Sequence, residues 1–158
     1  KPANRKLQAS GRQKGLFGHL SRNPYRSVCT ITSHDMPTLR MWWDENISRT
    51  QEYYNTMLYR EGPAPHPLPG WLARDIIARH LASPSMLCIL SVQDWLAIDE
   101  KLRLPDAEAE RINIPANPKH YWRYRMHLSL EELVANTPKA IYFIVFIIVF
   151  ILKVLILE

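Results

Sequence analysis

The chain has 158 residues, and its 20 Lys and Arg against 15 Asp and Glu give a formal net charge of +5. With 47% hydrophobic and only 22% charged residues, the composition excludes a disordered polyelectrolyte, a collagen-like repeat and a Gly/Ser linker, and the length suffices for one modest core. The two cysteines, Cys29 and Cys88, are too far apart for a dense disulfide scaffold or a cysteine-based zinc site. This usage favours a reducing compartment, and we expect a cytoplasmic location.

The chain begins with a basic segment. Residues 1–30 hold seven Lys and Arg residues and no acid. Such an arm can bind nucleic acid or an anionic membrane, but residues 1–16 contain no aromatic side chain that could stack on a base. We therefore expect residues 1–16 to be a solvated leader unrelated to the domain, and we expect no nucleic-acid partner.

The next segments are patterned as an ordered domain. The β-branched run 27–32 follows the turn former Asn23-Pro24 and predicts a buried strand. Residues 44–59 place apolar side chains among charges at a spacing that suits a helix. The stretch 62–70 contains four prolines, which exclude a helix or a central strand and predict an ordered loop.

A second helix and strand follow. Apolar residues at helical spacing predict a helix over 71–82, which Ser83-Pro84 ends. The continuous apolar run 86–92 is typical of a strand covered on both faces, and another short helix is predicted to open near Gln93. This order predicts an α/β fold with a parallel sheet, either doubly wound or a (β/α)8 barrel. Because a barrel needs about 250 residues, the chain would supply a partial TIM barrel, its last two βα units.

The C-terminal segment, residues 138–158, has a different character. Between residues 140 and 157 every side chain but Lys153 is apolar, and as a helix this stretch would be roughly 27 Å long, close to the thickness of a membrane core. Its many Ile and Val residues also suit a buried β-strand. Three readings stay open: a frameshift-derived sequence, a membrane tail and a buried element. We expect a membrane partner only if this tail is genuine.

Polar and aromatic side chains crowd the segment that leaves the first predicted strand. Residues 33–43 include a carboxylate, an imidazole, a guanidinium and two indoles, from Asp35, His34, Arg40, Trp42 and Trp43. Carboxylate and imidazole groups can hydrogen-bond vicinal hydroxyls, and flat indoles cover the apolar faces of sugar rings. The segment thus indicates a carbohydrate site. The alternative is that Asp35 caps the following helix and that the tryptophans belong to the core.

Two other kinds of site are disfavoured. Ser33, His34 and Asp35 are consecutive, whereas the members of a hydrolytic triad converge from separate positions. The six histidines show no i, i+4 pair of the kind that binds zinc on a helix. We therefore expect neither a metal nor another cofactor.

Four segments, 17–43, 67–99, 110–115 and 121–125, together resemble the C-terminal third of the 4-alpha-glucanotransferases of glycoside hydrolase family 77, the amylomaltase or disproportionating-enzyme family. The likeness covers about residues 17–137. It implies that the chain is the C-terminal part of a catalytic barrel. The implied substrates are α-1,4-glucans, namely maltodextrin, starch and glycogen.

The resemblance also implies roles for individual residues. Asp35 matches the family's third carboxylate, which holds hydroxyls of the sugar at the cleavage point and favours its oxocarbenium-like geometry, and His34 is its partner. We expect Arg40, Trp42, Trp43 and Asn113 to bind substrate. Other matched positions are expected mainly to support the site: Gln93, Asp94, Arg111, Trp122, Arg123 and Arg125.

The resemblance implies a retaining transfer that needs a carboxylate nucleophile and a carboxylic acid/base roughly 5 to 5.5 Å apart. In the family both precede the His-Asp pair, so neither is expected in this chain, and Glu45 and Glu52 are not candidates. We expect a fragment that is inactive alone. The alternatives are a membrane-tethered binding protein anchored by residues 139–158 and a nucleic-acid binder acting through residues 1–14.

Overall fold

The computed structural model describes residues 17–122 and 124–136. The chain divides into two compact units, with the boundary between Tyr124 and Arg125, and each is described here by itself. The predictions for the leader, residues 1–16, and for the apolar tail, residues 138–158, fall outside the described residues. Within the two described ranges, no helix has the length and apolar character that a membrane crossing requires.

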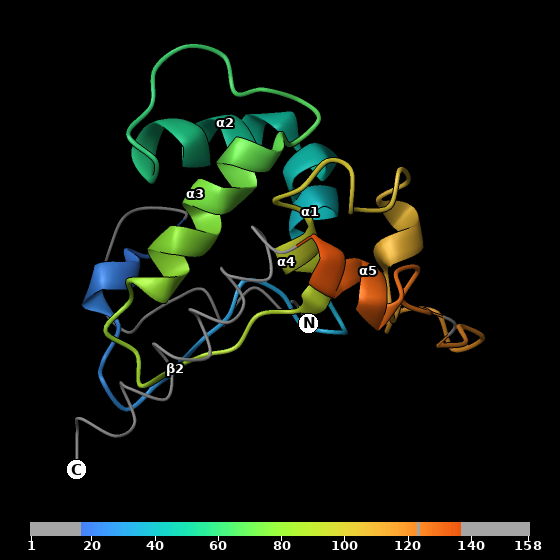
Figure 1. Ribbon diagram of the computed structural model, residues 1–158. Coiled ribbons are helices and arrows are strands. Elements are labelled where there is room, and N and C mark those ends of the chain that lie inside the picture. Colours follow the sequence, from blue (N-terminus) through green and yellow to red (C-terminus); the bar gives the residue numbers. More distant parts are fainter. Residues whose placement is uncertain (1–16, 123, 137–158) are drawn as a thin grey trace. The chain divides into compact units, whose positions relative to one another are not determined.

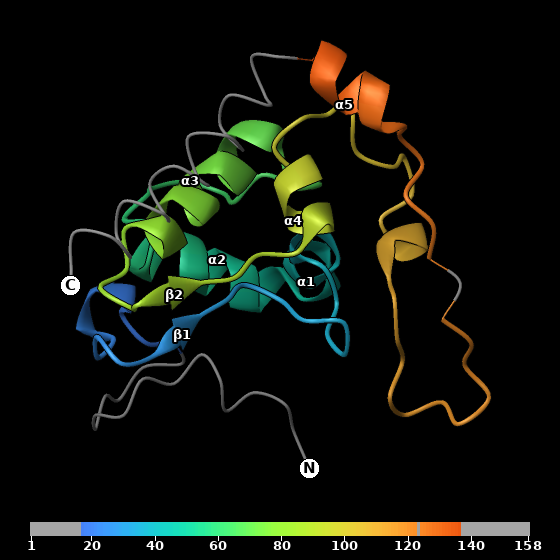
Figure 2. The ribbon, with the colours of Figure 1, turned by 60° about the horizontal axis from the view of Figure 1, so that its bottom comes forward.

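The first unit contains a short parallel sheet, whose second strand, β2, is labelled in Figure 1. Strand β1, Val28–Cys29, pairs in parallel with strand β2, Leu87–Cys88, so that Val28 lies opposite Leu87 and Cys29 opposite Cys88. Figure 2 shows the two strands side by side, although they are almost 60 positions apart in the chain. The parallel pairing confirms the predicted α/β class, while the assignment to the last units of a barrel stays a prediction.

Both strands are shorter than predicted. Regular pairing covers two residues of each, although the Ile89 N–H still donates to the Cys29 carbonyl with an N–O distance of 2.9 Å. The expectation that residues 86–92 are covered on both faces is wrong, because Ile89 is 58% exposed and Met86 is also exposed. Among the described residues each strand pairs along one edge only, so the ladder is short and the apolar run is left half-covered.

Two helices follow β1 where the sequence predicts one. Helix α1, Leu39–Glu45, and helix α2, Ile47–Thr56, are separated by Asn46 in an extended conformation. The Asn46 side chain accepts a hydrogen bond from the Arg49 N–H at 2.9 Å and so caps α2. Helix α2 lies inside the predicted range 44–59, but it begins after the Asn46 cap, and the residues before Asn46 belong to α1, which the sequence does not predict.

The remaining helices of the first unit agree with the predictions. Helix α3, Gly70–Leu81, lies within one residue of the predicted range and follows the proline-rich loop, and helix α4, Val92–Leu96, begins one residue before Gln93. Glycine is required at the start of α3, because a Cβ at Gly70 would lie 2.3 Å from the carbonyl oxygen of Ile98. The backbone after α4 therefore packs directly on the first turn of α3.

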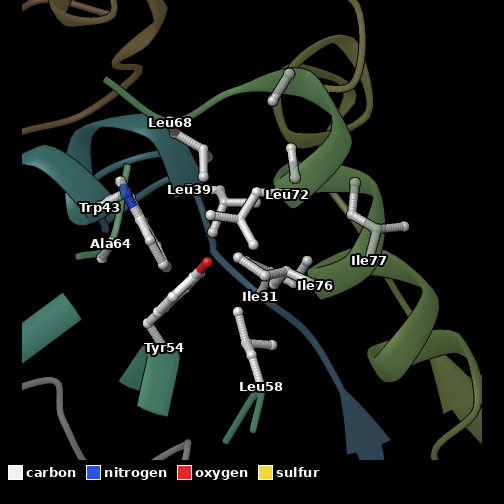
Figure 3. Packing of buried hydrophobic residues seen from close by; sticks show 12 residues of the cluster. Ile31, Leu39, Trp43, Tyr54, Leu58, Ala64, Leu68, Leu72, Ile76 and Ile77 are labelled. Atoms are coloured by element: carbon white, nitrogen blue, oxygen red, sulfur yellow. The ribbon is translucent and has the colours of Figure 1, made fainter. Parts of the chain in front are cut away.

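The hydrophobic core lies between α3 and the pair α1 and α2 (Figure 3). Helix α3 contributes one wall through inward side chains at helical spacing, and the Pro-rich loop closes one end with Leu68. The buried cluster comprises Ile31, Leu39, Trp43, Tyr54, Leu58, Ala64, Leu68, Leu72, Ala73, Ile76, Ile77 and Ala97. This packing fixes the segment that leaves β1, because Ile31 and Leu39 flank it on both sides.

The second unit contains helix α5, Leu130–Ala135. Its start is a capping box: the Glu132 N–H donates to the Ser129 hydroxyl at 3.2 Å, and the Ser129 N–H donates to the Glu132 carboxylate at 2.7 Å. These reciprocal bonds satisfy backbone donors that the first turn of a helix leaves free. The Ser129 N–H and, at 3.0 Å, the Ser129 hydroxyl both donate to the Glu132 carboxylate and lower the pKa of Glu132, because they stabilise its charged form.

Candidate active site

Asp35 lies six positions beyond the end of β1, in a turn closed by a hydrogen bond from the Met36 N–H to the Ser33 carbonyl. Its side chain is 48% exposed. One carboxylate oxygen accepts a hydrogen bond of 2.7 Å from the Asn113 amide and lies 3.3 Å from Nε2 of His34. Asp35 does not cap the following helix, since Thr38 is the N-cap of α1. The exposed carboxylate is therefore held in place while part of it faces solvent.

Aromatic surface lies next to this carboxylate. The ring of His34, whose side chain is 53% exposed, lies 5.2 Å from the ring of Trp122, centroid to centroid. Trp122 is itself 58% exposed. The fold thus brings His34, Asp35, Asn113 and Trp122 together from three separate parts of the chain.

The loop that carries Asn113 is fixed by its own hydrogen bonds. The Arg111 side chain donates to the Asn113 carbonyl at 3.1 Å, and the His120 ring donates to the Ile112 carbonyl at 2.9 Å. Both bonds restrain the backbone on either side of Asn113. The amide can therefore hold the Asp35 carboxylate in one orientation.

Arg40 takes a structural position instead of facing the site. It is 7% exposed and forms a buried ion pair with Glu110. Its guanidinium also donates to the Leu104 carbonyl at 2.6 Å and to the Pro105 carbonyl at 3.3 Å. All these partners lie on the segment after α4, so Arg40 fastens that segment to α1. We do not retain the expectation that Arg40 binds substrate.

Trp43 and Trp42 pack against side chains of the domain interior to different degrees. Trp43 has no exposed surface, donates to the Pro65 carbonyl at 2.9 Å and points into the core in Figure 3. Trp42 is half-buried and packs edge-on against Tyr53 and Phe17. The core alternative therefore describes Trp43, which we do not retain as a surface for a sugar ring, whereas the binding role of Trp42 stays a prediction.

Glu110, to which the sequence analysis gives no role, is the centre of the supporting network. It is 3% exposed, pairs with Arg40 and accepts a hydrogen bond of 3.1 Å from the Thr38 hydroxyl. Burial raises the pKa of Glu110, and the charge and hydrogen bonds of Arg40 and the Thr38 hydroxyl oppose this rise. The sequence signal for it is an arginine inside an apolar helix, since a buried guanidinium requires an acid.

Asp94, on helix α4, hydrogen-bonds both the segment that leaves β1 and the first turn of helix α1. It is fully buried and accepts hydrogen bonds from the Thr32 hydroxyl and, at 2.8 Å, from the Leu39 N–H. Burial raises the pKa of Asp94, and bonds from Thr32, Leu39 and Ser91 oppose the rise. Asp94 therefore satisfies a free N–H in the first turn of α1. The placement agrees with the expected supporting role.

The arrangement suits recognition of a polyhydroxylated ligand. Asp35 can accept hydrogen bonds from neighbouring hydroxyls, His34 can donate or accept, and the indole of Trp122 offers a flat apolar face. Asp94 and Glu110 are buried and engaged by hydrogen bonds, so neither faces solvent as Asp35 does. Among the described residues, Asp35 is therefore the exposed carboxylate of this site, and the acids that support the site, Asp94 and Glu110, are buried.

Comparison with known proteins agrees with this description. A family model described as 4-alpha-glucanotransferase, glycoside hydrolase family 77, matches residues 5–130 and so extends into the segment expected to be an unrelated leader. A 4-alpha-glucanotransferase from Oryza sativa subsp. japonica is 39% identical over 117 residues, which are 74% of this chain and 12% of the rice protein. One from Chlamydia pneumoniae is 31% identical over 108 residues, 68% of this chain and 20% of that enzyme.

No solved structure matches the chain. The chain spans only 12% to 23% of the length of the curated relatives it matches, so the comparison concerns one short part of each enzyme. The family match nevertheless covers most of the chain, including the segment with His34 and Asp35 and the loop with Asn113. The chain therefore belongs to the 4-alpha-glucanotransferase family, glycoside hydrolase family 77.

Proposed function

We propose that this chain forms the part of a 4-alpha-glucanotransferase that presents the third carboxylate, Asp35, to an α-1,4-glucan such as maltodextrin, starch or glycogen. The observation that supports the proposal is the exposed Asp35 carboxylate beyond the carboxyl end of β1, held by Asn113 and flanked by His34. Active sites of parallel α/β enzymes lie at this end of their strands. In this proposal, strands β1 and β2 are the last two strands of a catalytic barrel.

In this proposal each side chain has a distinct task. Asp35 accepts hydrogen bonds from hydroxyls of the glucose unit at the cleavage point, and these bonds strengthen as positive charge develops on the ring. His34 hydrogen-bonds a neighbouring hydroxyl, and Trp122 covers an apolar sugar face. Asn113 positions the carboxylate through its 2.7 Å hydrogen bond.

The covalent step of a retaining transfer belongs to other carboxylates. A nucleophile forms a glycosyl-enzyme, and an acid/base protonates the leaving oxygen and then activates the acceptor hydroxyl. By resemblance to the family, both groups come from sequence that precedes the His-Asp pair and that this chain does not contain. The chain would therefore stabilise a transition state that it cannot form alone.

The first test asks whether the chain alone catalyses transfer. The purified 158-residue chain is expected to release no glucose from maltotriose, and a 4-alpha-glucanotransferase that is active on this substrate serves as the positive control. Free glucose and longer maltodextrins are measured by anion-exchange chromatography. Glucose release by the chain alone, at a rate proportional to its concentration, would contradict the proposal.

A hybrid enzyme tests the positive part of the proposal. In it, the segment of the rice relative that matches this chain over 117 residues is replaced by the corresponding residues of this chain. The hybrid is expected to retain transfer activity, because the chain supplies the same carboxylate and its support. A folded hybrid that binds maltodextrin and transfers nothing would contradict it.

A further inference from the structure

The two cysteines of the chain lie side by side on the sheet. Cys29 of β1 and Cys88 of β2 are register partners in the parallel ladder, and both carry thiols that are not joined in a disulfide. Neighbouring strands lie about 4.8 Å apart, which falls within the range of about 4.4 to 6.8 Å between the Cα atoms of disulfide-bonded cysteines. Side chains at paired positions also point to the same face of a sheet. The backbone therefore holds the two thiols ready to join.

The two thiols differ in exposure and chemistry. Cys88 is half-buried and Cys29 is buried. The side chain of Cys88 and that of Ser83 hydrogen-bond the Cys29 sulfur. The bond from Cys88 outweighs the effect of burial, and together with the bond from Ser83 it lowers the pKa of Cys29 to about 7. A large fraction of Cys29 is thus the nucleophilic thiolate at neutral pH.

We propose that Cys29 and Cys88 form a reversible disulfide that covalently joins β1 to β2, with a small-molecule disulfide such as oxidised glutathione as the oxidant. The bond would join the two strands that lead to the site. Asp35 follows Cys29 by six positions, and Asp94 follows Cys88 by six. A covalent link at this point fixes the spacing of the two segments that present the exposed carboxylate and its buried support.

The reaction takes place in two exchange steps. The Cys29 thiolate first takes the thiol proton of Cys88, the more exposed residue, through the hydrogen bond between the two side chains. The resulting Cys88 thiolate attacks oxidised glutathione, forms a mixed disulfide and expels one glutathione thiolate. The Cys29 thiolate then attacks the Cys88 sulfur, forms the Cys29–Cys88 bond and expels the second glutathione thiolate. Two protein thiols are oxidised, one glutathione disulfide is reduced to two thiols, and the two thiol protons pass to the released thiolates.

The test uses the full chain with oxidised glutathione, followed by acid quenching, alkylation and intact-mass measurement. We expect a monomer that has lost two hydrogen atoms, takes up no alkylating agent and recovers two reactive thiols on reduction. Closure is expected to be at least about tenfold faster than in urea, because the ladder pairs Cys29 with Cys88, whereas the two thiols are far apart along the unfolded chain. A folded chain that closes no faster than the unfolded one would overturn the proposal.

Single variants separate the two steps. Cys29→Ser is expected to accumulate a stable glutathione adduct on Cys88, because no neighbouring thiol remains to displace the glutathione. Cys88→Ser is expected to react more slowly than the wild type, because only the buried thiol remains. Equal amounts of stable adduct on the wild type and on Cys29→Ser would contradict the second step, and the urea comparison decides even where a variant folds poorly.

Discussion

Asp35→Asn in the hybrid enzyme is expected to lower kcat by about 10²- to 10³-fold with a smaller change in KM. The substitution keeps the size of the side chain but removes the negative charge that faces the sugar. Because ring charge develops only near the transition state, the loss falls mainly on the chemical step. Initial rates of glucose release from maltotriose, measured over a range of substrate concentrations, separate the two parameters.

Two companion variants control this experiment. Glu52→Gln makes the same chemical change at an exposed position on helix α2 and is expected to leave both parameters unchanged. Asn113→Ala leaves the carboxylate but removes its 2.7 Å hydrogen bond, and a partial loss of kcat is expected. An Asp35→Asn hybrid with the kcat of its parent would show that the carboxylate takes no part in transfer.

Arg40→Met is expected to destabilise the chain by about 3 to 5 kcal/mol, the cost of leaving one partner of a buried ion pair uncompensated. Glu110 would lose its guanidinium partner while staying in a site where it is 3% exposed. Urea unfolding of the full chain, followed by tryptophan fluorescence, measures the loss, since Trp43 is fully buried in the folded state.

The free-energy cost of Arg40→Met is expected to depend on pH. Burial already raises the pKa of Glu110 in the folded chain. The contribution of Glu110 to stability is therefore greatest at low pH, and it declines as the pH rises through the pKa of Glu110 in the folded chain. Removing Arg40 raises this pKa further, and the cost of Arg40→Met is therefore expected to be larger near neutral pH than in mild acid. A cost that is small and independent of pH would show that the pair is not buried in solution.

A double variant distinguishes the ion pair from simple packing. Replacing both partners, as Arg40→Met with Glu110→Leu, removes both buried charges at once and is expected to cost less than the sum of the single changes. Additive costs would mean that the two side chains stabilise the chain independently of each other.

The spacing of apolar residues along the chain predicts helices better than it predicts helix breaks or strand lengths. Helix α3 is clear in the sequence because its apolar residues recur at helical intervals up to Ser83-Pro84. The break between α1 and α2 is less visible, because Asn46 lies among charged residues that a solvated helix face also carries. Strand lengths depend on which edges are paired, and a local apolar run such as 86–92 carries no information about its partners.

The sequence motif brings His34 and Asp35 into one predicted site, but the sequence does not show which way the side chains after them point. Asp35, His34 and Asn113 do lie together, although residue types alone could not show that Asn113 reaches Asp35 across 78 positions. Residue types alone predict that residues 33–43 face the ligand as one segment, whereas residues 39–43 belong to helix α1. Helix α1 buries positions 39, 40, 41 and 43, so Arg40 and Trp43 support the fold and do not face a ligand.

The most direct measurement is a crystal structure of the hybrid enzyme with a bound, slowly processed maltodextrin analogue. We expect both oxygens of the Asp35 carboxylate to lie within about 3 Å of sugar hydroxyls, with Trp122 against a ring face. A sugar seated at the catalytic acids with the Asp35 side chain directed to bulk water would contradict it.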